Sequence, residues 1–273
     1  MPELPEVETV KRGLSHLMGP SRVIESVSLS KKALRFPYPN QFSKKLKNFE
    51  VEKLERRSKY LLFVGQKRVL VNHLGMTGNW RESDNLDRES HDHVLIKFNK
   101  GLSLVYNDVR RFGFFDLVSR EKLAESRWFQ HLGPEPLPPE KLHIDDVVDA
   151  IKRRRSAVKS VIMDAKVIVG VGNIYASEAL FRAGIRPQIQ ANRISKARLK
   201  TLVKCIQEVL AEAIESGGST IKDFKDSGGS SGYFQTQFNV YGKSGSLCRV
   251  CDTPIRSEMI TGRNTFWCPS CQS

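Results

Sequence analysis

The sequence lacks any hydrophobic run long enough to span a membrane, and its first residues lack the apolar core of a signal peptide. We therefore expect a cytoplasmic protein. Internal repeats and long low-complexity tracts are also missing, which argues against a repeat architecture. Cysteine is scarce, with 5 residues in 273, and in a reducing compartment closely spaced cysteines are more often metal ligands than disulfides.

Acidic residues are in short supply relative to basic ones. Asp and Glu total 30 against 44 Lys and Arg, which gives a formal net charge of +14. This excess predicts a polyanionic partner, and nucleic acid before a membrane surface, because no amphipathic lysine-rich segment dominates. A chain of 273 residues is long enough for two domains with cores of their own.

The N-terminus carries a candidate nucleophile. Removal of Met1 would leave Pro2 as a secondary amine, with the carboxylates of Glu3 and Glu6 close by in sequence. An α-amino group titrates near pH 8, so part of it is neutral and nucleophilic at pH 7. Its attack on a sugar carbon would give an iminium, which promotes elimination. The alternative is a plain helix start, because the apolar spacing of residues 7–17 predicts a helix whose dipole favours acidic residues in its first turn.

Residues 22–118 alternate apolar and polar side chains with period two. We expect residues 1–132 to form an antiparallel β-sandwich that carries the N-terminal helix. Lys59 follows two arginines just before one of the predicted strands. It either protects a strand edge with charge or serves as a phosphate contact or second proton carrier beside the terminal amine.

Three loops at strand ends, residues 73–78, 91–93 and 108–113, display potential functional groups. The His-Asp-His sequence at 91–93 could suggest a metal site, but no third ligand is evident, so a phosphate contact or a hydrogen-bonded loop is the better interpretation. Met76 and Phe112 would usually be core residues. A protein that opens a DNA duplex, however, needs apolar wedges of this kind.

Residues 133–139 are rich in proline and mark the predicted linker, after which the apolar periodicity becomes helical. Residues 152–159 contain five cations, which either form a solvated helix face or follow a phosphate backbone. Gly170 and Gly172 precede a predicted helix that Asn173 can cap, and such a turn can bind phosphate. The expected helices span residues 142–153, 156–163, 173–183 and 195–216.

The C-terminal segment carries two Cys-x2-Cys pairs separated by 16 residues, a spacing typical of a zinc ribbon. We expect one structural Zn²⁺ bound by Cys248, Cys251, Cys268 and Cys271. The metal would brace a hairpin at residues 254–267 whose tip holds Arg263 for a phosphate contact. The fifth cysteine, Cys205, is interpreted as a buried apolar residue.

Together, several motifs resemble those of bacterial formamidopyrimidine-DNA glycosylases, and the resemblance runs from Met1 to Gln272. The motifs are residues 1–9, 56–61 around Lys59, 73–76, 91–93, 110–113, 170–175 and the terminal ribbon. The resemblance implies an α+β fold in which a helix-two-turn-helix domain and a β-hairpin zinc ribbon follow the sandwich. It implies the domains 1–132, a linker at 133–139, a helical domain at 140–238 and the ribbon at 239–273.

The resemblance also implies a bifunctional glycosylase and apurinic-site lyase that acts on oxidised purines in duplex DNA. Pro2 would attack C1′ of the damaged nucleotide and form a Schiff base, Glu3 would donate a proton for ring opening, and Glu6 would orient the sugar or the amine. Lys59 would be the acid–base group of β-elimination, and Arg263 would take part in δ-elimination.

The remaining assignments concern DNA binding. The residues that would grip phosphates around the lesion are His91, Arg110, Arg155, Asn173 and Arg263. The residues that would fill the space left by a flipped-out nucleotide are Met76, Arg110 and Phe112. Lys159 would approach the lesion side of the bound DNA, and residues 219–235 would form a lid over the extruded base.

Two rival hypotheses remain open. The related endonuclease VIII enzymes prefer oxidised pyrimidines, although Leu4 and Arg110-Arg111-Phe112 favour the purine-specific branch. A non-catalytic DNA-binding zinc protein would account for the charge and the ribbon but has no use for an N-terminal Pro-Glu. Nothing in the sequence, such as a heptad seam, predicts an oligomer, so we expect a monomer.

Overall fold

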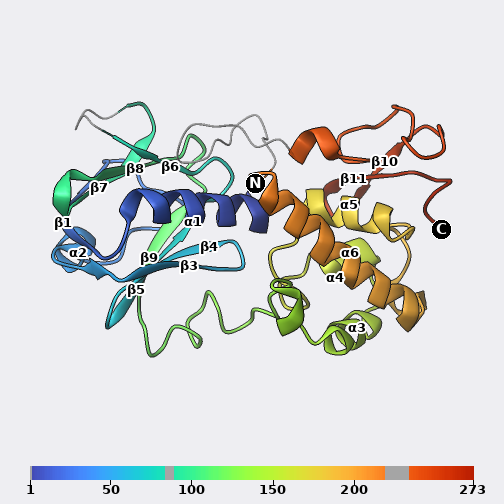
Figure 1. Ribbon diagram of the computed structural model, residues 1–273, viewed down its shortest axis with the longest axis horizontal. Helices are drawn as coiled ribbons and strands as arrows, with labels where there is room; N and C mark the ends of the chain where they lie inside the picture. Colours follow the sequence, from blue (N-terminus) through green and yellow to red (C-terminus); the bar gives the residue numbers. More distant parts are fainter. Residues whose placement is uncertain (1, 84–88, 219–233) are drawn as a thin grey trace. The chain divides into compact units, whose positions relative to one another are not determined.

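The computed structural model describes residues 2–83, 89–218 and 234–273 (Figure 1). These residues form two compact units. Unit 1 comprises residues 2–83, 89–130 and 216–218, and unit 2 comprises residues 131–215 and 234–273. Contacts therefore place the predicted linker, most of the helical segment and the ribbon in one unit, while the boundaries at 132, 139 and 238 stay predictions. Most of the predicted lid, residues 219–233, lies outside the described residues.

Unit 1 contains two antiparallel sheets, with strand orders β2-β1-β7-β8-β6 and β3-β4-β5-β9. The strands are β1 (Arg22–Leu29), β2 (Glu50–Val51), β3 (Lys53–Arg57), β4 (Tyr60–Val64), β5 (Arg68–His73), β6 (Asn79–Glu82), β7 (Asp92–Phe98), β8 (Ser103–Asn107) and β9 (Phe114–Ser119). A short helix, α2 (Phe42–Leu46), and a 3-10 turn, η1 (Asn99–Gly101), connect strands of unit 1. The turn η1 joins β7 to β8 as an antiparallel hairpin.

Helix α1 (Leu4–Met18) lies in the core of unit 1 and contacts strands of both sheets, β6 in one and β3 and β4 in the other (Figure 1). Its apolar residues recur every three or four positions, so that Val7, Val10 and Leu14 are fully buried on one stripe. They pack in the same cluster as large residues of the strands, including Phe63 and Trp80. The core therefore fixes the direction and the start of α1.

Unit 2 is helical and ends in a hairpin. Its helices are α3 (Ile144–Lys152), α4 (Val158–Ile162), α5 (Asn173–Arg182) and α6 (Lys196–Glu215), and its 3-10 turns are η2 (Pro139–Lys141), η3 (Ala191–Arg193) and η4 (Phe234–Gln237). The hairpin is formed by β10 (Arg256–Ile260) and β11 (Arg263–Trp267), with β11 against α5. The α+β fold and the helix positions expected from the sequence are thus confirmed to within two residues at each end. In residues 2–83, 89–218 and 234–273, no helix combines the length and apolar character needed to cross a bilayer.

Candidate functional site

The N-terminal carboxylates form a reciprocal cap on α1. The Glu3 N–H donates to Glu6 Oε2 at 2.8 Å, and the Glu3 side chain accepts from the Glu6 N–H. Glu3 and Glu6 are 2% and 0% exposed, and Pro2 is buried beside them. A carboxylate at this depth needs hydrogen-bond donors, and the first turn of a helix supplies them together with a positive dipole end. The arrangement holds two acid–base groups next to residue 2.

Glu8 connects α1 to the turn that carries Lys59. Arg56 Nε donates to Glu8 Oε2 at 3.0 Å, and Arg56 Nη1 donates to the Ser58 carbonyl oxygen at 3.0 Å. Burial raises the pKa of Glu8, but its bonds to Lys11 and Arg56 outweigh burial and hold the pKa below the ordinary value. Lys59 lies in the tight turn between β3 and β4, where Ser58 has a positive φ of 55°. No local pattern indicates this ion pair, which joins residues 48 positions apart in the chain.

His73, at the end of β5, stacks on Phe114 with ring centroids 5.4 Å apart, and it forms an edge-type contact with Tyr60 whose ring centroids are 5.0 Å apart. Burial lowers the pKa of His73 to about 4, with the charge of Lys59 as a second cause. The neutral ring accepts the Gly75 N–H at Nδ1, at 3.0 Å. His73 therefore fixes the start of the loop that carries Met76.

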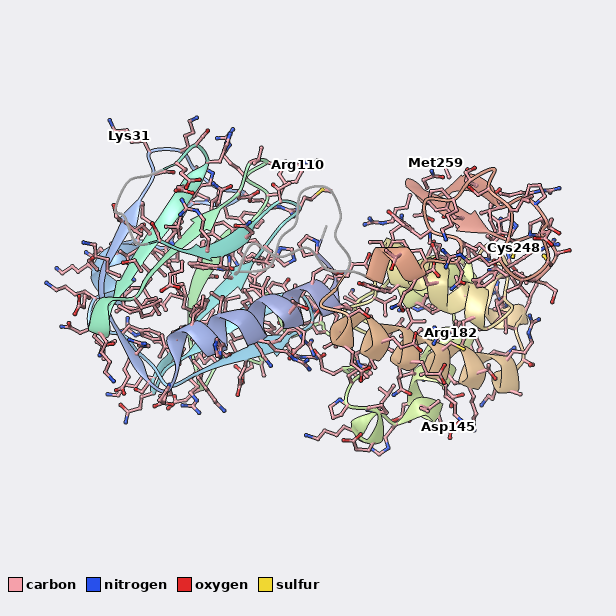
Figure 2. All side chains as sticks on the ribbon, turned by 45° about the horizontal axis from the view of Figure 1, so that its top comes forward. Lys31, Arg110, Asp145, Arg182, Cys248 and Met259 are labelled. Atoms are coloured by element: carbon pink, nitrogen blue, oxygen red, sulfur yellow. The ribbon has the colours of Figure 1, made fainter. Side chains whose placement is uncertain are left out.

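The predicted wedge residues lie on two loops of unit 1. Met76 is partly buried, whereas Phe112 is 43% exposed and the Arg110 guanidinium lies 4.9 Å from the centre of its ring. Figure 2 marks Arg110 on the edge of this unit. Val109, 56% exposed, is a further exposed apolar residue on the same loop that sequence periodicity did not single out. Exposed apolar side chains beside an arginine suit a surface that enters a base stack.

The His-Asp-His loop is held by hydrogen bonds. His91 is exposed, with a φ of 72°, while His93 is 1% exposed. His93 Nε2 donates to the Asp108 carbonyl oxygen at 3.0 Å, and Nδ1 lies within hydrogen-bond distance of the Ser30 hydroxyl oxygen, at 3.0 Å. Both ring nitrogens are thus used within the protein, as the hydrogen-bonded-loop interpretation predicts.

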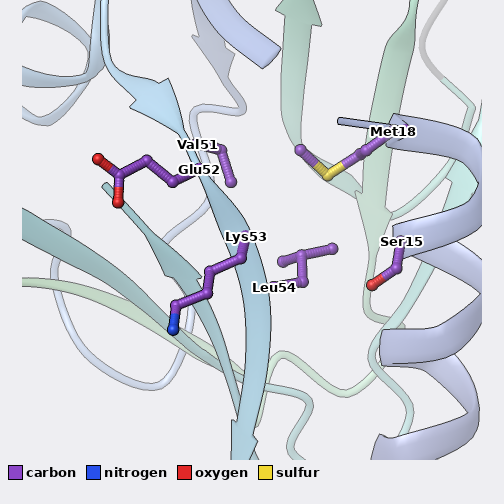
Figure 3. Close-up of a pocket in the computed structure, with 7 residues that line it drawn as sticks. Ser15, Met18, Val51, Glu52, Lys53 and Leu54 are labelled. Carbon is purple, nitrogen blue, oxygen red and sulfur yellow. The ribbon is translucent and has the colours of Figure 1, made fainter. Parts of the chain in front are cut away.

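A surface pocket of about 220 Å³ lies at the far end of α1, between Ser15, Met18 and the segment Val51–Leu54 (Figure 3). The helix has 15 residues, so its length of about 22 Å at 1.5 Å per residue separates this pocket from Pro2. The pocket is therefore not part of the N-terminal site.

In unit 2, a buried lysine joins the start of α5 to the hairpin. Lys159 is 1% exposed, and its Nζ donates to Asn173 Oδ1 at 2.6 Å and to Thr265 Oγ1 at 2.7 Å. Asn173 Nδ2 in turn donates to the Asn264 carbonyl oxygen at 3.0 Å. We interpret Lys159 as the residue that holds Asn173 against β11, and its direct contact with DNA stays a prediction.

The expectation that Asn173 caps α5 is wrong. Gly172 occupies the N-cap position, and the helix start has no side-chain cap. Asn173 is the first helical residue, and its amide is taken up by Lys159 and Asn264.

The basic residues nearby are exposed. Arg155 follows the end of α3, and Arg263 begins β11 after a two-residue turn in which Thr261 and Gly262 both have positive φ. This is the turn geometry that matches the twist of paired strands. A pocket of about 160 Å³ lies between α4 and the hairpin tip and is lined by Lys159 and Arg263 among others.

The four ribbon cysteines converge on one point (Cys248 is marked in Figure 2). Their Sγ atoms all lie within 4.8 Å of one another, with separations of 3.3 Å for Cys251 and Cys271 and 3.4 Å for Cys251 and Cys268. A tetrahedral Zn–S₄ centre with bonds near 2.3 Å has sulfur atoms about 3.8 Å apart. Backbone N–H groups of Val250 and Cys271 point to cysteine sulfur atoms. The predicted donor set therefore fits one structural zinc ion, and it is the one cluster of metal-binding side chains among the described residues.

Three parts of the chain match described protein families. Residues 1–115 match the formamidopyrimidine-DNA glycosylase N-terminal domain, residues 132–225 match the formamidopyrimidine-DNA glycosylase H2TH domain, and residues 245–273 match the zinc finger found in FPG and IleRS. The matches cover both units.

Whole-chain relatives agree with these matches. The formamidopyrimidine-DNA glycosylase of Bdellovibrio bacteriovorus is 45% identical over 276 aligned positions and covers 100% of both chains. A complex of a Lactococcus lactis FPG mutant with Fapy-dG containing DNA has a TM-score of 0.89 at 32% identity, with both chains covered fully. A MutM complex with carbocyclic 8-oxo-G containing DNA has a TM-score of 0.90 at 33% identity over 100% of both chains. The chain belongs to the formamidopyrimidine-DNA glycosylase family.

Proposed function

We propose that this protein is a DNA glycosylase that removes oxidised purines, 8-oxoguanine and formamidopyrimidines, from duplex DNA and then cleaves the strand as an apurinic-site lyase. The observation that carries this proposal is the buried cap of Glu3 and Glu6 beside Pro2 at the start of α1. Family membership supports it, as do the lesion-containing DNA complexes of similar proteins.

The chemistry follows from the groups at the N-terminus. Once Met1 is removed, the Pro2 nitrogen attacks C1′ of the damaged nucleotide and displaces the base. Glu3 gives a proton to the deoxyribose ring oxygen, so the ring opens and an iminium forms on Pro2. Glu6 holds the Glu3 backbone in place through the 2.8 Å bond. Lys59 acts as the acid–base group of β-elimination, and Arg263 assists the second, δ, elimination.

Binding must precede this chemistry, because a stacked base is out of reach. Extruding a nucleotide costs a few kcal/mol, which phosphate contacts and wedge side chains have to offset. His91, Arg110, Arg155, Asn173 and Arg263 supply the phosphate contacts, and Met76, Arg110 and Phe112 fill the gap in the stack. The net charge of +14 favours association with DNA and makes it depend on salt.

The deciding experiment is reductive trapping. The full-length, zinc-loaded protein is incubated with a duplex that carries 8-oxoguanine opposite cytosine, in the presence of sodium borohydride, and the N-terminus is checked by mass spectrometry. We expect a covalent adduct at residue 2 with chains that begin at Pro2, and none with chains that retain Met1. Tight binding without any adduct would favour the non-catalytic zinc protein instead.

A second duplex separates the two enzymatic hypotheses. It carries an oxidised pyrimidine in place of 8-oxoguanine and is otherwise identical. Faster cutting of the pyrimidine duplex would overturn the purine assignment. We also propose that the protein acts as a monomer, which sedimentation of the protein with and without the duplex would test.

A further inference from the structure

The loops that carry the proposed DNA contacts of unit 1 meet at one buried aspartate. Asp108 is 0% exposed. Its Oδ1 accepts the Thr77 hydroxyl at 2.5 Å, and its Oδ2 accepts the Gly113 N–H at 2.7 Å. Its backbone N–H donates to the His91 carbonyl oxygen at 3.0 Å. One side chain therefore touches the Met76 loop (residues 74–78) and the Arg110 loop (residues 108–113), while its backbone holds the loop of His91.

Thr77 completes this junction. Its hydroxyl donates to Asp108 and accepts the backbone N–H of Arg110 at 3.0 Å, so it links the two wedge loops twice. Thr77 is 7% exposed, which makes solvent a poor substitute for either bond. The side chains of Met76, Arg110 and Phe112 take no part in these bonds. The bonds hold the backbone on which those side chains stand.

Packing at the junction leaves no room for the loops to slide. A Cβ on Gly75 would lie 2.3 Å from the Gly113 nitrogen, and a Cβ on Gly113 would lie 1.7 Å from the Tyr106 hydroxyl oxygen. That hydroxyl donates to the Leu74 carbonyl oxygen at 3.2 Å and also contacts Asp108 Oδ2 at 3.4 Å. Burial beside Asp108 raises the pKa of Tyr106 well above its ordinary value, so the phenol keeps its proton. The two loops therefore behave as one body.

We propose that Thr77 and Asp108 are positioning residues that present Met76, Arg110 and Phe112 to DNA as a single preformed wedge. This inference rests on the proposed function. A side chain that replaces an extruded base works against the tendency of the neighbouring bases to restack, and unstacking costs a few kcal/mol per step. A wedge on an ordered backbone loses little conformational freedom on insertion, whereas separate mobile loops would lose it at that moment.

The test compares Thr77→Val with Thr77→Ser. Valine matches threonine in shape but lacks both hydrogen bonds, and serine retains them. Single-turnover excision is measured on an 8-oxoguanine duplex and on a duplex with a preformed abasic site, where no lesion base has to be unstacked. The borohydride adduct counts active molecules, so a partly unfolded preparation does not distort the rates. Fluorescence of a 2-aminopurine next to the lesion reports unstacking directly.

We expect Thr77→Val to excise 8-oxoguanine about tenfold more slowly, and the increase in 2-aminopurine fluorescence should be slowed by the same factor. This is the effect of losing one to two ordinary hydrogen bonds. Strand cleavage at the abasic site should fall much less, and Thr77→Ser should stay close to the wild type on both duplexes. Equal rates for the two variants, or an equal loss on both duplexes, would overturn the inference. If the wild type itself formed no adduct, the proposed function would fail instead.

Asp108→Asn keeps the test decisive if the valine variant does not fold. Its amide oxygen can still accept the Gly113 N–H, but its amide nitrogen cannot accept the Thr77 hydroxyl. We expect Asp108→Asn to slow excision less than Thr77→Val does and more than Thr77→Ser does. The slowing should again be larger on the 8-oxoguanine duplex than on the abasic duplex. The absence of such a difference between duplexes would contradict a positioning role.

Discussion

His73 provides a prediction whose size follows from the structure. Its pKa is lowered to about 4 from the ordinary 6.5, because the ring is packed among aromatic side chains and lies near Lys59. The unfolded chain therefore takes up a proton on this residue between pH 6.5 and pH 4, while the folded protein does not. Stability is retained above pH 6.5 and falls as the pH is lowered through this window.

The magnitude comes from the same two values. One pKa unit corresponds to about 1.4 kcal/mol, so lowering the pH from 7 to 5 should remove at most about 2 kcal/mol of unfolding free energy through His73. The variant His73→Asn should lack this loss, because its side-chain oxygen can accept the Gly75 N–H without titrating. Urea unfolding of both proteins at the two pH values gives the part of the pH dependence of the unfolding free energy that comes from His73, because all other titrating groups are the same in the two proteins.

An NMR titration of the histidine rings provides a direct check. We expect the His73 signals to remain unchanged down to about pH 5, well below the ordinary histidine value of about 6.5, because burial lowers the pKa of His73 to about 4. A midpoint near 6.5 for His73, or an equal pH dependence of stability in both proteins, would refute the reasoning. Either result would mean that the ring is not held neutral by its surroundings.

Three further predictions concern the other groups. Glu3→Gln should bind the lesion duplex in a gel-shift assay yet excise it about a hundredfold more slowly or worse, because an amide cannot donate the proton. Lys159→Met should weaken DNA binding because Asn173 is no longer held in place, but it should not change the salt dependence of binding. Arg155→Ala should reduce the slope of log affinity against log salt concentration by about 1, as measured by fluorescence anisotropy. Chelation of zinc, or the substitution Cys268→Ser, should unfold the ribbon and leave unit 1 folded, which circular dichroism would detect. Either change should also abolish tight DNA binding. Unchanged binding after zinc loss would contradict this account of the ribbon.

The sequence predicted elements that depend on local pattern. The period-two segments became the two sheets, the apolar stripe of residues 7–17 became the buried face of α1, and the cysteine spacing became a convergent donor set. These features follow from neighbouring residues in the chain. For that reason they could be found without knowing which segments meet in space.

Long-range contacts could not be predicted in this way. Thr77 and Asp108 lie 31 positions apart, and no local pattern in either loop indicates that these two side chains meet. The basic run at 152–159 looked like one surface, but α3 ends at Lys152 and α4 begins at Val158. Because of this break Arg155 is exposed, whereas the Lys159 side chain is buried and donates a hydrogen bond to Thr265 of the hairpin. Burial of a charged residue depends on partners that only the fold brings near.

The junction of Thr77 and Asp108 has a consequence for protein engineering. The junction joins the two loops through their backbone and through the buried side chains of Thr77 and Asp108. The side chains at positions 76, 110 and 112 form none of its hydrogen bonds. A combinatorial library at these three positions should therefore yield mostly folded proteins. Such a library could be screened for altered lesion selectivity, with the scaffold beneath acting as a constant platform.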